Sequence, residues 1–177
     1  FDANASGPWD IAAGPDGNLW YTDFADSAAV VKMTPTGSTT RYPLEAEAYP
    51  KGITAGPDGN LWFTESGSRN RIGRITPSGT IDEFNIGLST NTQSWDIAAG
   101  PDGNLWFTEY NASKIGRITP AGTINEFSTG PHPWGIAAGP DGALWFTQYA
   151  SNAIGRMTTA GSMTEYTGAG APWLLAT

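Results

Sequence analysis

The feature that most constrains the fold of this chain is a repeat that contains tryptophan. Four tryptophans each end a Gly-Pro-Asp-Gly-Asn/Ala-Leu-Trp run, at intervals of 42, 44 and 39 residues: Trp20, Trp62, Trp106 and Trp145. The other four stand five residues before such a run, or where the next run would begin: Trp9, Trp95, Trp134 and Trp173. A unit of this length cannot bury its own apolar face and needs neighbours to stack on. The period therefore predicts a propeller or a solenoid.

The repeat that begins at residue 95 shows how one unit is built. Its segments 95–100, 105–109, 115–119 and 123–127 are short and rich in apolar or β-branched residues, which is typical of strands. The first two segments are separated by Pro101, Asp102 and Gly103, where proline presets φ, aspartate caps the backbone and glycine takes a positive φ. A Pro-x-Gly turn separates the last two. One unit is therefore predicted to be a small antiparallel sheet of four strands.

The second strand of each unit is apolar on both faces, since Leu105 and Phe107 point one way and Trp106 the other. Sheets that need cover on both faces and recur at this period are typical of propeller blades. We expect an all-β fold, a β-propeller of four-stranded antiparallel blades, with about four blades at 8–43, 50–85, 94–128 and 133–167. Residues 1–2 would end a preceding blade and 171–177 would begin a further one. The strand-two tryptophans are expected to be buried between blades. A β-solenoid is the alternative, but its rungs are shorter.

Composition narrows the classes of partner. The formal net charge is −8 and the chain has only three lysines, which repels phosphate backbones and anionic membrane surfaces. We therefore expect neither nucleic acid nor a membrane as a partner. Cysteine is absent, so the redox compartment cannot be argued from disulfides. Few lysines with abundant Gly, Thr, Ser and Asn are typical of secreted proteins, which favours an extracellular location.

The motif Gly-Pro-Asp-Gly-Asn-Leu-Trp-Phe-Thr-Glu, followed by Ile-Gly-Arg-Ile-Thr-Pro-x-Gly-Thr-Ile, closely resembles the virginiamycin B lyase (streptogramin lyase) family of β-propellers. The match is nearly complete at 56–81 and 100–124 and looser at 14–39 and 139–163. The resemblance implies a seven-bladed propeller with a magnesium ion that opens the lactone of streptogramin B antibiotics by elimination. It also implies histidines just before the Gly-Ile of strand one, and a functional glutamate at the end of a Leu-Trp-Phe-Thr-Glu strand.

The chain departs from that pattern at the histidine positions. These positions hold Trp9, Lys51, Trp95, Trp134 and Trp173, and the glutamate position holds Asp23, Glu65, Glu109 and Gln148. The single histidine, His132, stands two residues before Trp134. A carboxylate without an imidazole partner cannot reproduce the acid–base pair that the resemblance implies. The lyase constellation therefore cannot be assembled from this chain alone.

The strand-one tryptophans are the candidate ligand-binding residues. Aromatic faces at a channel mouth can stack a sugar, a peptide or a flat drug-like ring. The same residues can equally seal the gap between adjacent blades, and the sequence leaves both interpretations open. The candidates are Trp9, Trp95, Trp134 and Trp173.

A second candidate site consists of the recurring acids Asp23, Glu65 and Glu109. A ring of acids at one rim can hold a divalent cation, and magnesium is expected only if the chain is part of a lyase. The alternative is that these acids cap strand ends or pair with Arg74, Arg117 and Arg156.

The sequence thus favours a binding or scaffold module with a small molecule or glycan as ligand. The first alternative is part of a magnesium-dependent streptogramin B lyase whose catalytic histidines lie outside this chain, so enzymatic activity stays an open question. The second is a structural, self-assembling repeat. Apolar blade faces at the ends, including the Phe1 side and Leu174–Leu175, predict self-association or inclusion in a longer propeller.

Overall fold

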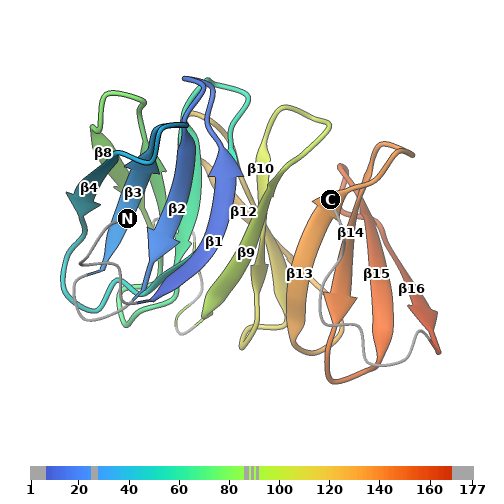
Figure 1. Cartoon of the computed structure of the whole chain (residues 1–177). Coiled ribbons are helices and arrows are strands. Elements are labelled where there is room, and N and C mark those ends of the chain that lie inside the picture. Colours follow the sequence, from blue (N-terminus) through green and yellow to red (C-terminus); the bar gives the residue numbers. More distant parts are fainter. Residues whose placement is uncertain (1–6, 25–27, 86–87, 89, 91, 169–177) are drawn as a thin grey trace.

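The computed structural model describes residues 7–24, 28–85, 88, 90 and 92–168, which form four separate four-stranded sheets (Figure 1). Trp173, residues 1–2 and residues 171–177, including Leu174–Leu175, lie outside the described residues. The first sheet contains β1 (Pro8–Ala13), β2 (Leu19–Asp23), β3 (Ala29–Met33) and β4 (Thr39–Pro43). The second contains β5 (Pro50–Ala55), β6 (Leu61–Glu65), β7 (Arg71–Ile75) and β8 (Ile81–Phe84). The third contains β9 (Ser94–Ala99), β10 (Leu105–Glu109), β11 (Lys114–Ile118) and β12 (Ile124–Ser128). The fourth contains β13 (Pro133–Ala138), β14 (Ala143–Gln148), β15 (Ala153–Thr158) and β16 (Met163–Thr167).

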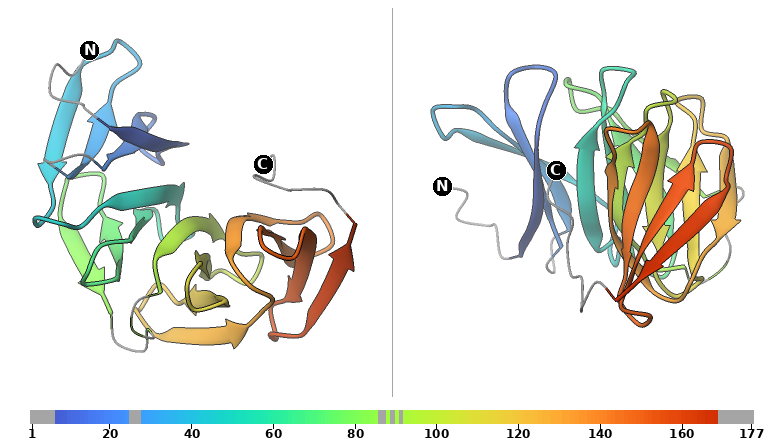
Figure 2. Two further views of the ribbon diagram at one scale, coloured as in Figure 1. Left: turned by 90° about the horizontal axis from the view of Figure 1, so that it is seen from below. Right: turned by 90° about the vertical axis from the view of Figure 1, so that its right-hand side faces the viewer.

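Each sheet is an antiparallel meander in which every strand pairs with the next along the chain. This confirms the predicted all-β propeller with about four blades. Figure 2 shows the four blades as an arc, with the first strand of each blade on the concave side and the fourth strand on the outside. Consecutive first strands, β1, β5, β9 and β13, contact one another along this concave side. No described helix is long and apolar enough to cross a membrane.

The predicted turns are present where Pro-Asp-Gly occurs. Gly59 and Gly103 have φ values of 76° and 74°, in the left-handed region that glycine tolerates best. The turn aspartate also has a second role that sequence reasoning missed. Asp102 accepts a hydrogen bond of 3.0 Å from the indole Nε1 of Trp106, and each of the other three repeats has the same bond. The turn motif therefore also satisfies the one polar group of the buried tryptophan.

The strand-two tryptophans fill the space between blades. Trp20, Trp62 and Trp106 are fully buried, and each packs on residues of the next blade, as Trp62 packs on Leu105 and Phe107. Burial of a large apolar side chain is worth about 1.5–3 kcal/mol. Trp145 is only partly buried, which corrects the expectation for the fourth member. It belongs to the last described blade, so no further described blade covers it.

Aromatic residues on the fourth strands complete these interfaces from the outside. Tyr42, Phe84, Phe127 and Tyr166 stack on the strand-two tryptophan of their own blade at centroid distances of 5.4–5.6 Å. The ring also occupies the space above a turn glycine of the following blade. A Cβ on Gly122, for example, would lie 2.5 Å from the ring of Phe84. Each of the first three blades therefore inserts an aromatic ring into a position of the next blade where only glycine fits.

Candidate ligand-binding site

The structure brings together the three described strand-one tryptophans, although they belong to three different blades. The ring centroids of Trp9 and Trp95 are 5.5 Å apart, and those of Trp95 and Trp134 are 4.3 Å apart. Trp9 is 43% exposed, and the other two are partly buried. Trp173, the fourth candidate, lies outside the described residues. The three indoles form a continuous aromatic surface at the start of the first strands, which we call the aromatic rim.

Lys51 occupies the equivalent position in the second blade and fills the space between two of these indoles. Its Nζ lies 3.5 Å from the ring centroid of Trp9 and 4.1 Å from that of Trp95, with Phe24 at 5.2 Å. The residue is 8% exposed. Burial lowers the pKa of the Lys51 amine from 10.5 to about 8, because the charged form loses hydration. The family resemblance places a histidine here, whereas this chain places an amine against aromatic faces.

Further aromatic residues extend the rim, and sequence reasoning missed them. Tyr110 stacks on His132 with a centroid distance of 4.5 Å and also contacts Trp134 edge-on at 5.6 Å. Tyr149 lies 6.4 Å from Trp134, and Phe24 lies 5.4 Å from Trp9. These residues immediately follow the acid or amide that ends strand two. An aromatic residue recurs at that position in three of the four repeats, and this was the signal available in the sequence.

The residue before each of the strands β5, β9 and β13 has an unusual backbone conformation. Tyr49, Gln93 and His132 immediately precede strands β5, β9 and β13 and have φ values of 47°, 47° and 56°. Their carbonyl oxygens accept hydrogen bonds from the loop that follows strand two, as the His132 oxygen does from the Tyr149 N–H at 3.1 Å. Side chains in the left-handed region are uncommon, so this repeated strain marks a position that the surrounding structure fixes. His132 itself is half-buried and stacks on Tyr110.

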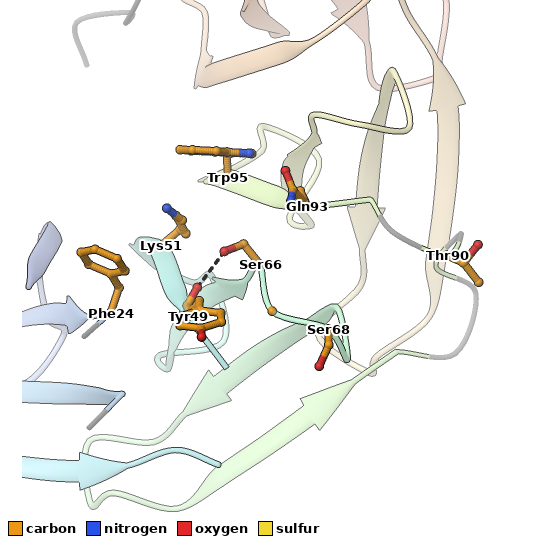
Figure 3. A pocket seen from close by; sticks show the side chains of 9 residues that line it. Phe24, Tyr49, Lys51, Ser66, Ser68, Thr90, Gln93 and Trp95 are labelled. Atoms are coloured by element: carbon orange, nitrogen blue, oxygen red, sulfur yellow. Dashed lines mark hydrogen bonds between the residues drawn. The ribbon is translucent and has the colours of Figure 1, made fainter. Parts of the chain in front are cut away.

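Two hollows adjoin the rim. The axial cavity has a volume of about 790 Å³ and is lined by the first strands. Its walls include Trp9–Ala13 in the first blade and Trp134 and Ile136 in the fourth. The rim pocket has a volume of about 690 Å³ and is lined by residues of the first three blades, from Phe24 of the first to Trp95 of the third (Figure 3). Its walls are formed by Phe24, Tyr49, Lys51, Ser66, Gly67, Ser68, Thr90, Gln93 and Trp95. Both volumes lie in the range of small-molecule sites, and Trp95 contributes to both.

Two aspartates line the axial cavity and also join the blades. Asp10 accepts a hydrogen bond of 2.8 Å from the Ile53 N–H of the next blade, and Asp96 accepts one of 2.8 Å from Ile136. Burial is the largest influence on both carboxyls and raises the pKa of Asp96 to about 6, with a further contribution from the charge of Asp10. The hydrogen bonds that Asp96 accepts from the N–H groups of Ile136 and Ile97 favour its charged form and oppose that rise. These carboxylates are therefore committed to the blade interface.

The recurring acids Asp23, Glu65 and Glu109 are all buried at the end of strand two, each within its own blade. Asp23 accepts hydrogen bonds from Arg41 at 2.8 Å and from the Gly7 N–H at 3.0 Å. Glu65 accepts one from Nε of Arg71 at 3.0 Å. Among the residues that the structure describes, neither carboxylate oxygen of Glu109 has a hydrogen-bond partner. Burial, with repulsion from Glu126, raises the pKa of Glu109 to about 8, so it is largely protonated at neutral pH.

The arginines expected to pair with these acids have other partners. Arg74 and Arg117 lie over the indoles of Trp62 and Trp106 at 5.5 Å, and Arg156 lies over Trp145 at 5.9 Å. Arg74 also donates to the Pro120 carbonyl of the next blade at 2.9 Å, and Arg117 donates to that of Thr159 at 3.1 Å. Arg74 pairs with strand-four Asp82, and Arg156 pairs with turn Asp141. The proposed pairing was therefore wrong, because these arginines lie beside the turn and outer-strand residues of their blades.

The residues do not fit a magnesium site. Among the described residues, no three His, Cys, Asp or Glu side chains lie together as a group able to hold a metal ion. Asp23 and Glu65 are each engaged by an arginine, and the largely protonated Glu109 is a poor ligand for a hard cation. The described carboxylates therefore provide no site from which a metal ion could take part in a reaction.

Comparison with known proteins supports this architecture. The model of the virginiamycin B lyase family matches residues 1–171. The crystal structure of virginiamycin B lyase from Staphylococcus aureus is 36% identical, with a TM-score of 0.91 over 98% of this chain and 61% of that one. A catalytically inactive form of that enzyme with quinupristin gives the same identity and TM-score. The chain therefore spans about 61% of the length of these relatives. A search of curated protein sequences finds no significant match.

More distant structures share only the fold. A gluconolactonase from Xanthomonas campestris is 20% identical and aligns with a TM-score of 0.72 over 92% of this chain and 62% of that one. The family-model match and the 36% identity over nearly the whole chain are much more specific than this likeness. The repeat, the blade architecture and these matches together show that the chain belongs to the virginiamycin B lyase family.

Proposed function

We propose that this part of the propeller is a binding module, whose aromatic rim takes a planar small molecule or a sugar. The observation that carries the proposal is the contact of Trp9, Trp95 and Trp134 along one surface, although they come from three separate blades. Large apolar faces with few rotamers stack flat ligands at low entropic cost. The rim pocket and the axial cavity provide concave space on either side of Trp95.

Polar groups beside the rim complete such a site. Ser66, Ser68 and Gln93 line the rim pocket together with the amine of Lys51. A few polar groups that converge on an aromatic wall are typical of small-molecule sites, where they fix the orientation of the ligand. The ligand of the Staphylococcus aureus relative, quinupristin, is therefore a suitable first probe, and cellotetraose tests the sugar class.

Isothermal titration calorimetry with quinupristin and with cellotetraose tests the proposal. We expect saturable binding of at least one probe, and a loss of affinity of at least about tenfold in Trp95→Ala, since truncation of a central aromatic anchor commonly costs more than 1 kcal/mol. Tyr166→Ala is the matched control, because Tyr166 is also aromatic and 48% exposed but lies on the outer strand β16. The absence of binding by both probes, or equal losses in the two variants, would contradict the proposal.

A second candidate function is that the chain forms part of a streptogramin B lyase. The family-model match and the 36% identity to virginiamycin B lyase favour it. The histidine positions of this chain hold tryptophan and lysine, so the reaction would need imidazoles supplied by further blades. Under this alternative the aromatic rim would contribute binding energy and the remaining blades would contribute the acid–base chemistry.

A further inference from the structure

The three lysines of the chain have different surroundings. Lys32 donates to the Pro77 carbonyl at 3.0 Å and lies 3.8 Å from a carboxylate oxygen of Asp16. Lys114 pairs with Glu126. Lys51 has no ion pair with any described carboxylate, and its Nζ instead faces the rings of Trp9 and Trp95. It is thus the one lysine of the described chain whose charge no acid stabilises.

The amine of Lys51 is also the only charged group that lines the rim pocket, as far as the described residues show. Figure 3 shows its side chain reaching from β5 toward the space between Phe24 and Trp95. The pocket, of about 690 Å³, offers room beside the amine for a ring-sized molecule. Trp95 supplies an aromatic wall, and Ser66 and Gln93 supply polar groups. The pocket therefore places a ring-sized space beside the Lys51 side chain, next to the indole of Trp95.

The protonation state of this amine suits nucleophilic chemistry. Burial lowers the pKa of Lys51 to about 8, so about half of the side chain is neutral at pH 8. A lysine with an ordinary pKa near 10.5 is less than about 1% neutral at the same pH. Desolvation in an apolar pocket is one of the known ways in which proteins activate a lysine toward carbonyl compounds.

We propose that Lys51 is a nucleophilic amine that forms an imine with aldehydes carrying a planar ring. The lone pair of the neutral Nζ attacks the carbonyl carbon, and the carbonyl π pair moves to oxygen. Transfer of a proton from nitrogen to oxygen gives a carbinolamine. Loss of water then gives the imine, while the ring of the aldehyde stacks on Trp95. This chemistry concerns the amine alone, so it holds whether or not the rim also binds quinupristin or a sugar reversibly.

Competitive labelling of the three lysines tests the proposal on the unmodified protein. The probe is 2-hydroxybenzaldehyde at pH 8, with sodium cyanoborohydride present to deliver hydride to the imine carbon and leave a stable secondary amine. Peptide mass spectrometry then gives the initial rate at each lysine, and the α-amino group is followed on its own peptide. We expect Lys51 to be labelled at least about tenfold faster than Lys32 and Lys114. Labelling at a similar or lower rate, or no labelling, would overturn the proposal.

Variants distinguish an amine that its surroundings activate from one that is merely accessible to the aldehyde. Without cyanoborohydride, imine absorbance should be lost in Lys51→Arg and retained in Lys32→Arg, which is the matched control. Trp95→Ala should slow labelling of Lys51, because the ring of the aldehyde loses the aromatic wall of the pocket on which it stacks. Unchanged rates at Lys32 and Lys114 in the same sample show that the variant is folded. Faster labelling of Lys51 in that folded variant would show that the indole only shields the amine, which contradicts the proposal.

Discussion

The hydroxyl of Thr22, on the second strand of the first blade, donates a hydrogen bond of 2.5 Å to the backbone carbonyl of Lys51 in the second blade. The bond recurs between later blades, from Thr64 to the Trp95 carbonyl at 3.2 Å and from Thr108 to the Trp134 carbonyl at 2.9 Å. The same hydroxyls accept the strand-one N–H of their own blade, where the ladder is interrupted by a bulge. One side chain per blade therefore fixes the backbone of the rim residue in the next blade.

The first prediction concerns this bond. Thr108→Val keeps the shape of the side chain but removes its hydroxyl, which leaves the partly buried Asp96 N–H and Trp134 carbonyl without that partner. We expect a loss of about 1–3 kcal/mol in the free energy of unfolding. Urea denaturation measures it. Thr164→Val, on the exposed face of β16, is the control and should change stability by less than about 0.5 kcal/mol. Equal effects in the two variants would show that the hydroxyl does not join the blades.

The second prediction uses two glycines with the same backbone conformation and different surroundings. Gly37 and Gly122 have φ values of 89° and 90°, but only Gly122 faces an aromatic ring, that of Phe84. No described atom lies within 4 Å of where a Cβ on Gly37 would stand. Alanine at either position costs the same backbone strain, so the difference between the two variants isolates packing. We expect Gly122→Ala to be less stable than Gly37→Ala by about 1–3 kcal/mol in thermal or urea unfolding. No difference would mean that Phe84 moves away without cost.

The third prediction is that the chain associates through the end of the arc that the first blade forms. Trp9, Ile11 and Leu19 of the first blade are 43%, 56% and 36% exposed. Exposed apolar faces of this kind are typical of interaction surfaces. We expect a concentration-dependent increase in mass by light scattering, and a specific interface of more than about 1,000 Å² in total. Ile11→Lys should weaken this association, whereas Tyr49→Lys, in the wall of the rim pocket and 43% exposed, should not. A monomer at high concentration would contradict this prediction.

The fourth prediction follows from Glu109. Burial and Glu126 raise its pKa in the folded state to about 8, while Lys114 opposes the rise. The folded state therefore binds the proton more tightly than the unfolded state, so this group destabilises the fold increasingly as pH rises from about 4.5 to about 8. Glu109→Gln removes that dependence. Its stability relative to the wild type should increase by about 2 kcal/mol or more between pH 5 and pH 8, as measured by urea denaturation at each pH.

The control for this pH dependence is Thr164→Val, which changes an exposed residue of β16 and removes no titratable group. Its stability relative to the wild type should stay nearly constant over the same range. A constant difference for Glu109→Gln as well would show that the Glu109 carboxyl titrates at an ordinary pKa in the folded protein.

The fifth prediction concerns streptogramin opening. The chain by itself, with magnesium added, should not consume quinupristin above the uncatalysed rate, because the imidazole positions hold Trp9, Lys51, Trp95 and Trp134. General acid–base catalysis usually contributes about 10²–10⁴ in rate, and that contribution is missing here. Liquid chromatography of the substrate over time measures the loss. Consumption that depends on magnesium and exceeds the background would contradict this prediction, and Glu65→Gln would then be the first variant to test.

The sequence by itself determined the turns and strands of a single blade. Each Gly-Pro-Asp-Gly run sets a turn through backbone preferences that act within four residues, and the alternation of Leu, Trp and Phe sets a strand covered on both faces. These are local effects, so the repeat shows them directly. Membership of the lyase family was also evident from the same motifs.

Only the tertiary structure decided how the blades meet and what the rim contains. Trp9 and Trp95 are 86 residues apart in sequence, and their contact around Lys51 depends on the rotation of each blade relative to the next. The ion pair of Arg74 and the charged neighbours of Glu109 likewise depend on which side chains the sheet register places side by side. No local pattern contains this information, because burial and electrostatic environment arise from residues that are distant along the chain. The packing of the blades thus brings the strand-one tryptophans together. It also buries Lys51 among them, which lowers the pKa of its amine.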